Sequence, residues 1–193
     1  MTALIWLLRP LHRLNGSVLW VCRWIAGAAL AVMVLVILVQ VFFRYVLNNA
    51  LPWPDEAARF MMLWMAGLAA PLAYRRGGFV AIDMLEEALP RRAADILSLV
   101  LLLIGLMVLS MAVQLGKAHV DSGWLFNSSS LKLPFSLIGL ADIRLKLAWM
   151  YMSLFAGVIL LLLVSVELVL RQIVTIAGRR DALPRLHALD LPE

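Results

Sequence analysis

The chain has 193 residues, of which 64% are hydrophobic and only 15% are charged, and its formal net charge is +5. A soluble globular domain is about half apolar and about a quarter charged, so this composition exceeds what one small core can bury. The basic residues are scattered between apolar runs and form no stripe, which excludes nucleic acid as a partner and favours a lipid bilayer as the surroundings.

Four apolar runs are long enough to cross a membrane. A bilayer core is about 30 Å thick and needs roughly 20 residues of α-helix. The runs cover residues 24–43, 57–74, 96–113 and 147–166. The sequence therefore predicts an all-α membrane protein with four transmembrane helices, in a single domain over residues 1–193.

The segments beside these runs predict further structure at the membrane surface. Two of them carry apolar residues at helical spacing, Leu4, Leu7, Leu8 and Leu11 in the first and Phe79, Ile82, Leu85 and Leu89 in the second. We expect both to form amphipathic helices that lie in the interface. The link from Lys117 to Lys146 contains Trp124 and Phe126, which favours an ordered interfacial loop.

Charged residues mark the start of the second run. Pro54 suits the first helical position, and Asp55 and Glu56 place negative charge at the positive end of the helix dipole. Arg59 follows within one helical turn of both acids. Either carboxylate is therefore expected to pair with it on one face of the helix.

The distribution of basic residues predicts the orientation in the membrane. They concentrate in the N-terminal segment, in the connection between the second and third runs, and after the fourth run. The positive-inside rule then places both termini in the cytoplasm. We also expect the N-terminal segment to be retained, because the apolar run after Arg23 is too long for the core of a cleaved signal.

Residues able to carry chemistry are few. Cys22 is the single cysteine, and His12, His119 and His187 are far apart in sequence. Neither a nucleophile with its base nor a metal-ligand spacing is visible, so we expect no catalytic residue, no metal and no cofactor. We expect Cys22 to be a small packing residue and His119 to be an interfacial polar residue without a partner. The spans also lack the polar groups that a self-sufficient transporter needs near mid-membrane, so the chain is expected to need a partner.

Several short motifs combine into a recognisable pattern. The segment Trp53–Phe60 reads WPDEAARF and is followed by Trp64 and Gly67. The segment Arg75–Gly78 (RRGG) follows the second run, and Leu131–Phe135 (LKLPF) precedes the fourth. In these motifs, and in the spacing of its spans, the chain resembles the small membrane subunit of tripartite ATP-independent periplasmic (TRAP) transporters, the DctQ-like family.

The resemblance implies a scaffold role. In this family the small subunit pairs with a large membrane subunit, which moves substrate by an elevator-like mechanism that is usually coupled to sodium. A periplasmic binding protein delivers the substrate, typically an organic acid anion. The resemblance thus implies a multi-pass protein of the bacterial inner membrane, in contact with these two partners and with membrane lipids. Many members have histidine where this chain has Phe79, so no role of that histidine carries over.

Particular residues follow from this interpretation. The candidates for contact with a partner are Trp53, Asp55, Glu56, Arg59, Trp64 and Gly67. Gly67 would also permit close packing of helices. The residues expected to anchor the topology and to bind anionic lipid head groups are Arg75, Arg76, Arg91 and Arg92. Glu167 and Arg171, one helical turn apart, are expected to form a pair at a helix end.

Two other hypotheses stay open at this stage. One is a small membrane enzyme or electron-transfer subunit acting on lipid or quinone, which would require convergent His, Asp or Glu side chains within the spans. The other is an assembly factor with four spans that serves a different complex. Gene neighbours would separate it from a transporter subunit, which should be encoded beside a large permease and a solute-binding protein.

Overall fold

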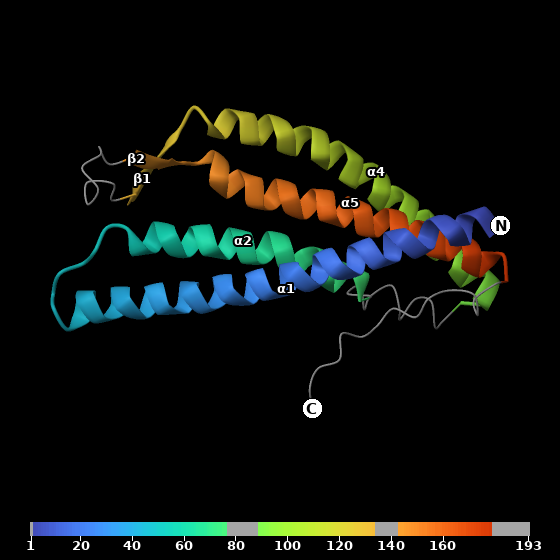
Figure 1. The fold of residues 1–193 in the computed structure, drawn as a ribbon, viewed down its shortest axis with the longest axis horizontal. Coiled ribbons are helices and arrows are strands. Elements are labelled where there is room, and N and C mark those ends of the chain that lie inside the picture. The colour runs from blue at the N-terminus through green and yellow to red at the C-terminus, as the bar shows by residue number, and fades with distance from the viewer. Residues whose placement is uncertain (1, 77–88, 134–142, 179–193) are drawn as a thin grey trace.

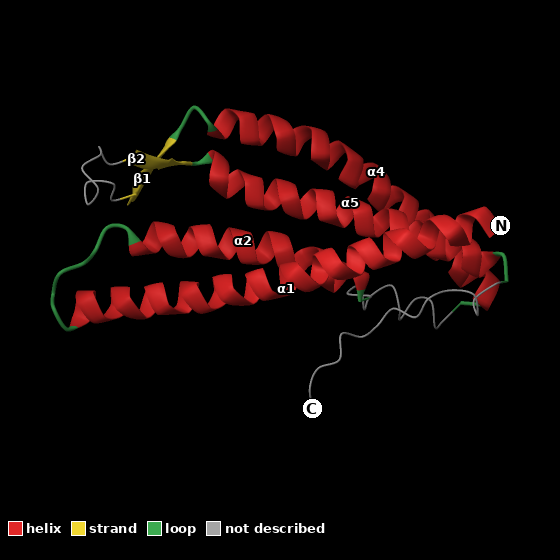
Figure 2. Ribbon diagram, viewed as in Figure 1, coloured by secondary structure: helices red, strands yellow, loops and turns green. Residues whose placement is uncertain are grey.

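The computed structural model describes residues 2–76, 89–133 and 143–178. Four long helices dominate it (Figure 2): α1 (Thr2–Tyr45), α2 (Pro54–Arg75), α4 (Arg91–Gly123) and α5 (Ala148–Ile176). Each of them is long and apolar enough to cross a membrane. The predicted spans lie within these helices, apart from Leu147, which directly precedes α5. The prediction of a helical membrane protein with four spans is confirmed.

The four helices adjoin one another in the order α1, α2, α5, α4 and form one layer along most of their length (Figure 1). At one end of the layer α1 and α4 end and α2 and α5 begin; we call it the Glu56 end. At the opposite end, the Glu167 end, the first half of α1 crosses α5 (Figure 1). A single layer leaves α2 and α5 with a neighbour on both sides and exposes both faces to the surroundings.

The first part of α1 differs from what the sequence predicts. We expected an interfacial helix near Leu8 that is separate from the first span, but α1 is continuous over 44 residues. Leu8 is buried and Leu11 is half-buried, so this part of the apolar stripe packs within the protein. The polar residues that interrupt the apolar pattern, His12 and Asn15, both contact Glu167 of α5.

Packing between α1 and α2 follows a heptad-like stripe. The α1 residues turned inward alternate at spacings of four and three, at Asn15, Leu19, Cys22, Ala26, Ala29, Met33, Val36 and Gln40. Such a stripe is the seam of side chains that fit into holes on a facing helix. Cys22 and Ala26 pack against Leu68 of α2, which confirms the packing role expected for Cys22.

The remaining surface of α1 and α4 is strongly apolar and open. On α4 a continuous stripe of exposed side chains comprises Ile96, Val100, Leu103, Met107 and Met111. On α1, Trp24, Leu35 and Leu38 are more than half exposed. Monomeric soluble proteins rarely expose contiguous apolar patches of this size, so these faces require lipid or a partner of similar polarity.

The connection between α4 and α5 also differs from the expectation of a loop from Lys117 to Lys146. The helix α4 continues to Gly123, and two short strands, β1 (Asn127–Leu133) and β2 (Ile143–Lys146), then pair antiparallel. Their register joins Asn127 to Lys146 and Leu133 to Ile143, with an irregularity between. Because α4 and α5 are antiparallel neighbours, the chain leaving one and entering the other is brought side by side, which favours this pairing.

Two sequence expectations lie outside the described residues. The second amphipathic stripe, at Phe79, Ile82 and Leu85, falls within residues 77–88. The Pro134–Phe135 part of the motif before the fourth span falls within residues 134–142.

Candidate functional site

The seam between α2 and α5 collects most of the residues singled out in the sequence. These two helices occupy the middle of the layer, so whatever joins them also joins the pair α1–α2 to the pair α4–α5 (Figure 1). The seam is held at three levels: a carboxylate at each end and a glycine contact between them. Each level uses a different kind of interaction.

At the Glu56 end, the carboxylate of Glu56 accepts hydrogen bonds from three consecutive serines of β1. Ser128 donates from its hydroxyl at 2.6 Å, Ser129 from its hydroxyl at 3.2 Å and its backbone N–H at 3.3 Å, and Ser130 from its backbone N–H at 2.8 Å and from its hydroxyl. Ser128 is almost fully buried and also accepts a bond from the Leu131 N–H. We call Glu56 with these three serines the Glu56 cluster. It attaches the strand pair to the first turn of α2.

This arrangement replaces the local ion pair expected for Glu56. Within residues 2–76, 89–133 and 143–178, Arg59 forms no salt bridge with Asp55 or Glu56. The acceptor oxygens of Glu56 are occupied by the serines, and an exposed ion pair with a long side chain gains little free energy in any case. Asp55 and Arg59 are both exposed. The acids still lie in the first turn of α2, where their negative charge interacts favourably with the positive end of the helix dipole.

In the middle of the seam, two glycines bring the helix backbones into contact. A Cβ atom added to Gly67 would lie 2.5 Å from the carbonyl oxygen of Ser153 on α5. A Cβ atom added to Gly157 would collide with the carbonyl group of Gly67. Small residues allow close approach where helices associate without a hydrophobic driving force. The close packing expected at Gly67 is confirmed, and its partner is Gly157 of the same chain.

At the Glu167 end, the side chain of Glu167 is fully buried among groups from three helices. Its Oε1 accepts hydrogen bonds from Arg75 Nη2 of α2 at 3.1 Å and from Arg171 Nε at 3.1 Å. Its Oε2 accepts a bond of 2.7 Å from Asn15 Nδ2 of α1. The Nδ1 atom of His12 lies 3.0 Å from Oε1. We call these five residues the Glu167 cluster.

His12 also contacts the two arginines of the Glu167 cluster. Its Nδ1 lies 2.8 Å from Arg75 Nη2 and 2.9 Å from Arg171 Nη2, both of which can only donate. Arg75 also donates to the backbone oxygen of His12 at 3.1 Å. The cluster thus ties the first half of α1, the end of α2 and the end of α5 together.

Two further hydrogen bonds extend the junction. The Tyr74 hydroxyl lies 3.4 Å from the buried hydroxyl of Ser165, next to the Glu167 cluster. The side chain of Gln172 donates to the backbone oxygen of Asp95 at 2.9 Å, which links α5 to the first turns of α4. All four helices are therefore connected through polar contacts at this end.

The residues predicted to contact a partner take different positions. Trp53 is 38% exposed at the start of α2, and Asp55 and Arg59 are exposed beside it. Trp64 is half-buried and packs against the cluster of Cys22, Ala26 and Leu68. Glu56 and Gly67 have their contacts within this chain. The exposed surface among these candidates is therefore at the first turns of α2.

The predicted lipid anchors also separate. The side chain of Arg75 is 14% exposed and hydrogen-bonded to Glu167, a role that sequence reasoning missed. Arg76 and Arg92 are exposed, and binding of lipid head groups there stays a prediction. Arg91 begins α4, and its side chain lies outside the described part of the chain.

The predicted pair of Glu167 and Arg171 is confirmed, with a distance of 3.0 Å. The sequence did not predict that the pair is buried or that Glu167 has further partners. A signal was present. His12 and Asn15 lie one turn apart among Leu8, Leu11 and Leu19, and a polar residue on a buried stripe needs a partner. His119, expected without a partner, has its ring 4.1 Å from that of Tyr151 between centroids.

The side chains of the seam are engaged in contacts between helices. No group of three His, Cys, Asp or Glu side chains that could hold a metal ion occurs among the described residues. The two carboxylates of the seam have their oxygens engaged by donors from the same chain. The site is therefore a set of fixed junctions between helices.

Comparison with known proteins gives a consistent result. Residues 33–175 match the family described as the DctQ component of tripartite ATP-independent periplasmic transporters. A Haemophilus influenzae protein with the provisional name TRAP transporter small permease protein is 31% identical over 61 residues. That match covers 32% of this chain and 38% of the length of the relative.

Proposed function

The chain belongs to the DctQ component family of TRAP transporters, and we propose that it acts there as a rigid wall that supports the large membrane subunit. Membership of this family makes it a transporter component with several membrane spans. The family implies, in general terms, partnership with a large membrane subunit and a binding protein. The mechanical role is our inference from the fold.

The observation that supports this role is the three-level junction of the α2–α5 seam. A helix layer with only lateral contacts would bend or shear along its seams if a neighbouring domain moved against it. Here the Glu56 cluster, the Gly67–Gly157 contact and the Glu167 cluster connect the two halves of the layer at both ends and in the middle. Breaking a buried ion pair costs about 3–5 kcal/mol, so the layer resists opening at the Glu167 end.

The apolar faces of the layer support the need for a partner. The exposed stripes of α1 and α4 offer broad surfaces to a second membrane protein or to lipid. The exposed residues Trp53, Asp55 and Arg59 at the start of α2 are our candidates for contact with the large subunit or with the docked binding protein. Arg76 and Arg92 are candidates for anchoring in anionic lipid.

The transport process itself is the finer part of the proposal. We propose uptake of an organic acid anion, delivered by the periplasmic binding protein and driven by a cation gradient, with sodium as the coupling ion. The large subunit would move in an elevator-like manner against this chain in a bacterial inner membrane. The excess of basic residues in the segments beside the Glu167 end supports the proposal that this end, with both termini, faces the cytoplasm.

Reconstitution of the purified components tests the proposal. Proteoliposomes containing this chain, the large subunit and the binding protein should take up the anion in the presence of a sodium gradient. Vesicles that lack this chain should show no uptake, and vesicles that contain it alone should show none either. Solute movement by the isolated chain would overturn the scaffold role, because a wall carries no substrate path of its own.

A further inference from the structure

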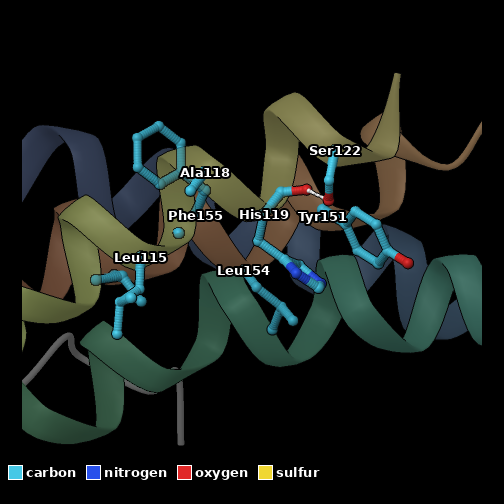
Figure 3. Close-up of a pocket in the computed structure, with 9 residues that line it drawn as sticks. Leu115, Ala118, His119, Ser122, Tyr151, Leu154 and Phe155 are labelled. Carbon is cyan, nitrogen blue, oxygen red and sulfur yellow. Dashed lines mark hydrogen bonds between the residues drawn. The ribbon is translucent and has the colours of Figure 1, made fainter. Parts of the chain in front are cut away.

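A groove lies between α4 and α5 near the Glu56 end of the layer. It has a volume of about 560 Å³ and is lined by two turns of each helix, including Leu115 and Ser122 of α4 and Tyr151 and Phe155 of α5 (Figure 3). This volume falls in the range of roughly 300–1,000 Å³ that is usual for pockets that hold small molecules. The groove is distinct from the α2–α5 seam and is not used in the proposed scaffold role.

Close helix packing shapes the floor of the groove. A Cβ atom added to Gly116 would lie 2.9 Å from the ring of Phe155, so this ring packs directly on the α4 backbone. A Cβ atom added to Gly123 would lie 2.8 Å from Ala148, which draws the two helices together beyond the groove. The groove is therefore closed at the Gly123 end and remains open to the side facing the membrane.

Polarity changes along the groove. The end farther from the membrane surface is lined by Leu115, Phe155 and Val158, and the end nearer the surface by His119, Ser122 and Tyr151. In Figure 3, Leu115 and Tyr151 lie at opposite ends of the row of side chains. Just beyond the polar end, Trp124 and Trp149 stack edge to face with ring centroids 6.3 Å apart. Tryptophan is enriched at the membrane–water interface, so this pair places the polar end at head-group depth.

The polar end has hydrogen-bonding capacity that the protein does not use. The Ser122 hydroxyl donates to the backbone oxygen of His119 at 2.7 Å. The His119 ring packs against the Tyr151 ring with their planes inclined at 44°, but neither its nitrogens nor the Tyr151 hydroxyl forms a hydrogen bond within the described part of the chain. These groups match the ester oxygens and the phosphate of a phospholipid.

We propose that this groove is a binding site for one phospholipid, with an acyl chain along Leu115, Phe155 and Val158 and the glycerol and phosphate groups at His119, Ser122 and Tyr151. The polarity gradient runs in the same direction as that of a lipid in the adjacent leaflet. The groove is about 10 Å long, since its lining spans roughly seven residues of each helix at about 1.5 Å rise per residue. An acyl chain is narrow enough to lie along a groove of this length, and the variants below distinguish it from a side chain of a partner helix.

Native mass spectrometry of the purified full chain, delipidated and titrated with phosphatidylglycerol or phosphatidylethanolamine, tests the site. Wild type should retain one phospholipid under conditions that remove the others. The variant Ala118→Phe fills the groove from its wall and should weaken retention at least about tenfold, as expected for the loss of a few buried methylene groups. The matched control Val108→Phe places the same ring on the exposed face of α4 outside the groove and should retain lipid as wild type does.

A second variant tests the head-group end of the groove. Tyr151→Phe removes only the hydroxyl and should reduce retention severalfold without changing the helical circular dichroism spectrum, which keeps the test informative if Ala118→Phe does not fold. The proposal is wrong if wild type retains no lipid or if Ala118→Phe and Val108→Phe behave alike. It is also wrong if Ala118→Phe leaves lipid retention unchanged but prevents association with the large subunit, because the groove would then receive a protein side chain. None of these outcomes bears on the scaffold role, which the reconstitution tests separately.

Discussion

The two ends of the α2–α5 seam are held together by different kinds of interaction. At each end a glutamate holds together elements that are distant in the sequence. Glu167 is fully buried and faces two guanidinium groups, whereas Glu56 is partly exposed and faces neutral hydroxyl and backbone donors. The stabilisation by a buried ion pair depends on both partners, because removal of one leaves the other as an uncompensated buried charge. When a carboxylate near the surface is removed, the neutral donors that it bound can form hydrogen bonds with water instead.

The comparison predicts that the Glu167 end dominates the stability of the layer. The variant Glu167→Gln removes the buried negative charge that faces Arg75 and Arg171, and the free energy of unfolding should fall by about 3–5 kcal/mol. Denaturant unfolding in detergent micelles, followed by tryptophan fluorescence, measures this change. If Glu167→Gln proved no more destabilising than Glu56→Gln, the distinction between the two ends would be wrong.

The glycine contact between the two ends is expected to come next. Gly67→Ala places a methyl group against the Ser153 carbonyl, and forcing the backbones apart should cost about 1–3 kcal/mol. Gly27→Ala on α1 is the matched control, because a Cβ atom there meets nothing within 4 Å. The control should be neutral or slightly stabilising, since alanine favours a helix more than glycine. Equal destabilisation by both variants would show that the contact at Gly67 contributes nothing specific.

The Glu56 end should give a smaller and more local effect. Glu56→Gln keeps one acceptor oxygen but loses the charge that strengthens the serine bonds, and we expect a loss of about 1–2 kcal/mol. Hydrogen exchange of the backbone amides of Ser129 and Ser130 should accelerate, while the amides of α5 near Glu167 keep their protection. Acceleration that extended equally to both ends would mean that the layer opens as one unit.

The smallest effect on stability is expected at an exposed candidate for partner contact. Arg59→Ala removes a side chain that has no ion pair within the described residues, so the free energy of unfolding should change by less than about 0.5 kcal/mol. The same variant should weaken co-purification of the large subunit. Unchanged co-purification together with unchanged stability would remove Arg59 from the proposed interface and leave the seam unaffected.

Local patterns predicted more of the helices than of the junctions between them. The spans were found from length and hydropathy, and the glycine at residue 67 and the pair of Glu167 with Arg171 from short-range spacing. The ion pair expected for Arg59 was wrong because Glu56 is bound by serines more than 70 positions away in the chain. The strand pair was missed because it depends on that same contact and on the adjacency of α4 and α5.

By itself, the sequence determined that this protein has four membrane-spanning helices, because the transfer of apolar side chains from water depends on composition and length within each segment. Only the tertiary structure decided which polar side chains meet. His12 and Glu167 are 155 positions apart, and their contact exists because α1 crosses α5 at one end of the layer. Hydrogen bonds and ion pairs act over a few ångströms and depend on direction, so their partners follow from the placement of the helices and not from the order of residues.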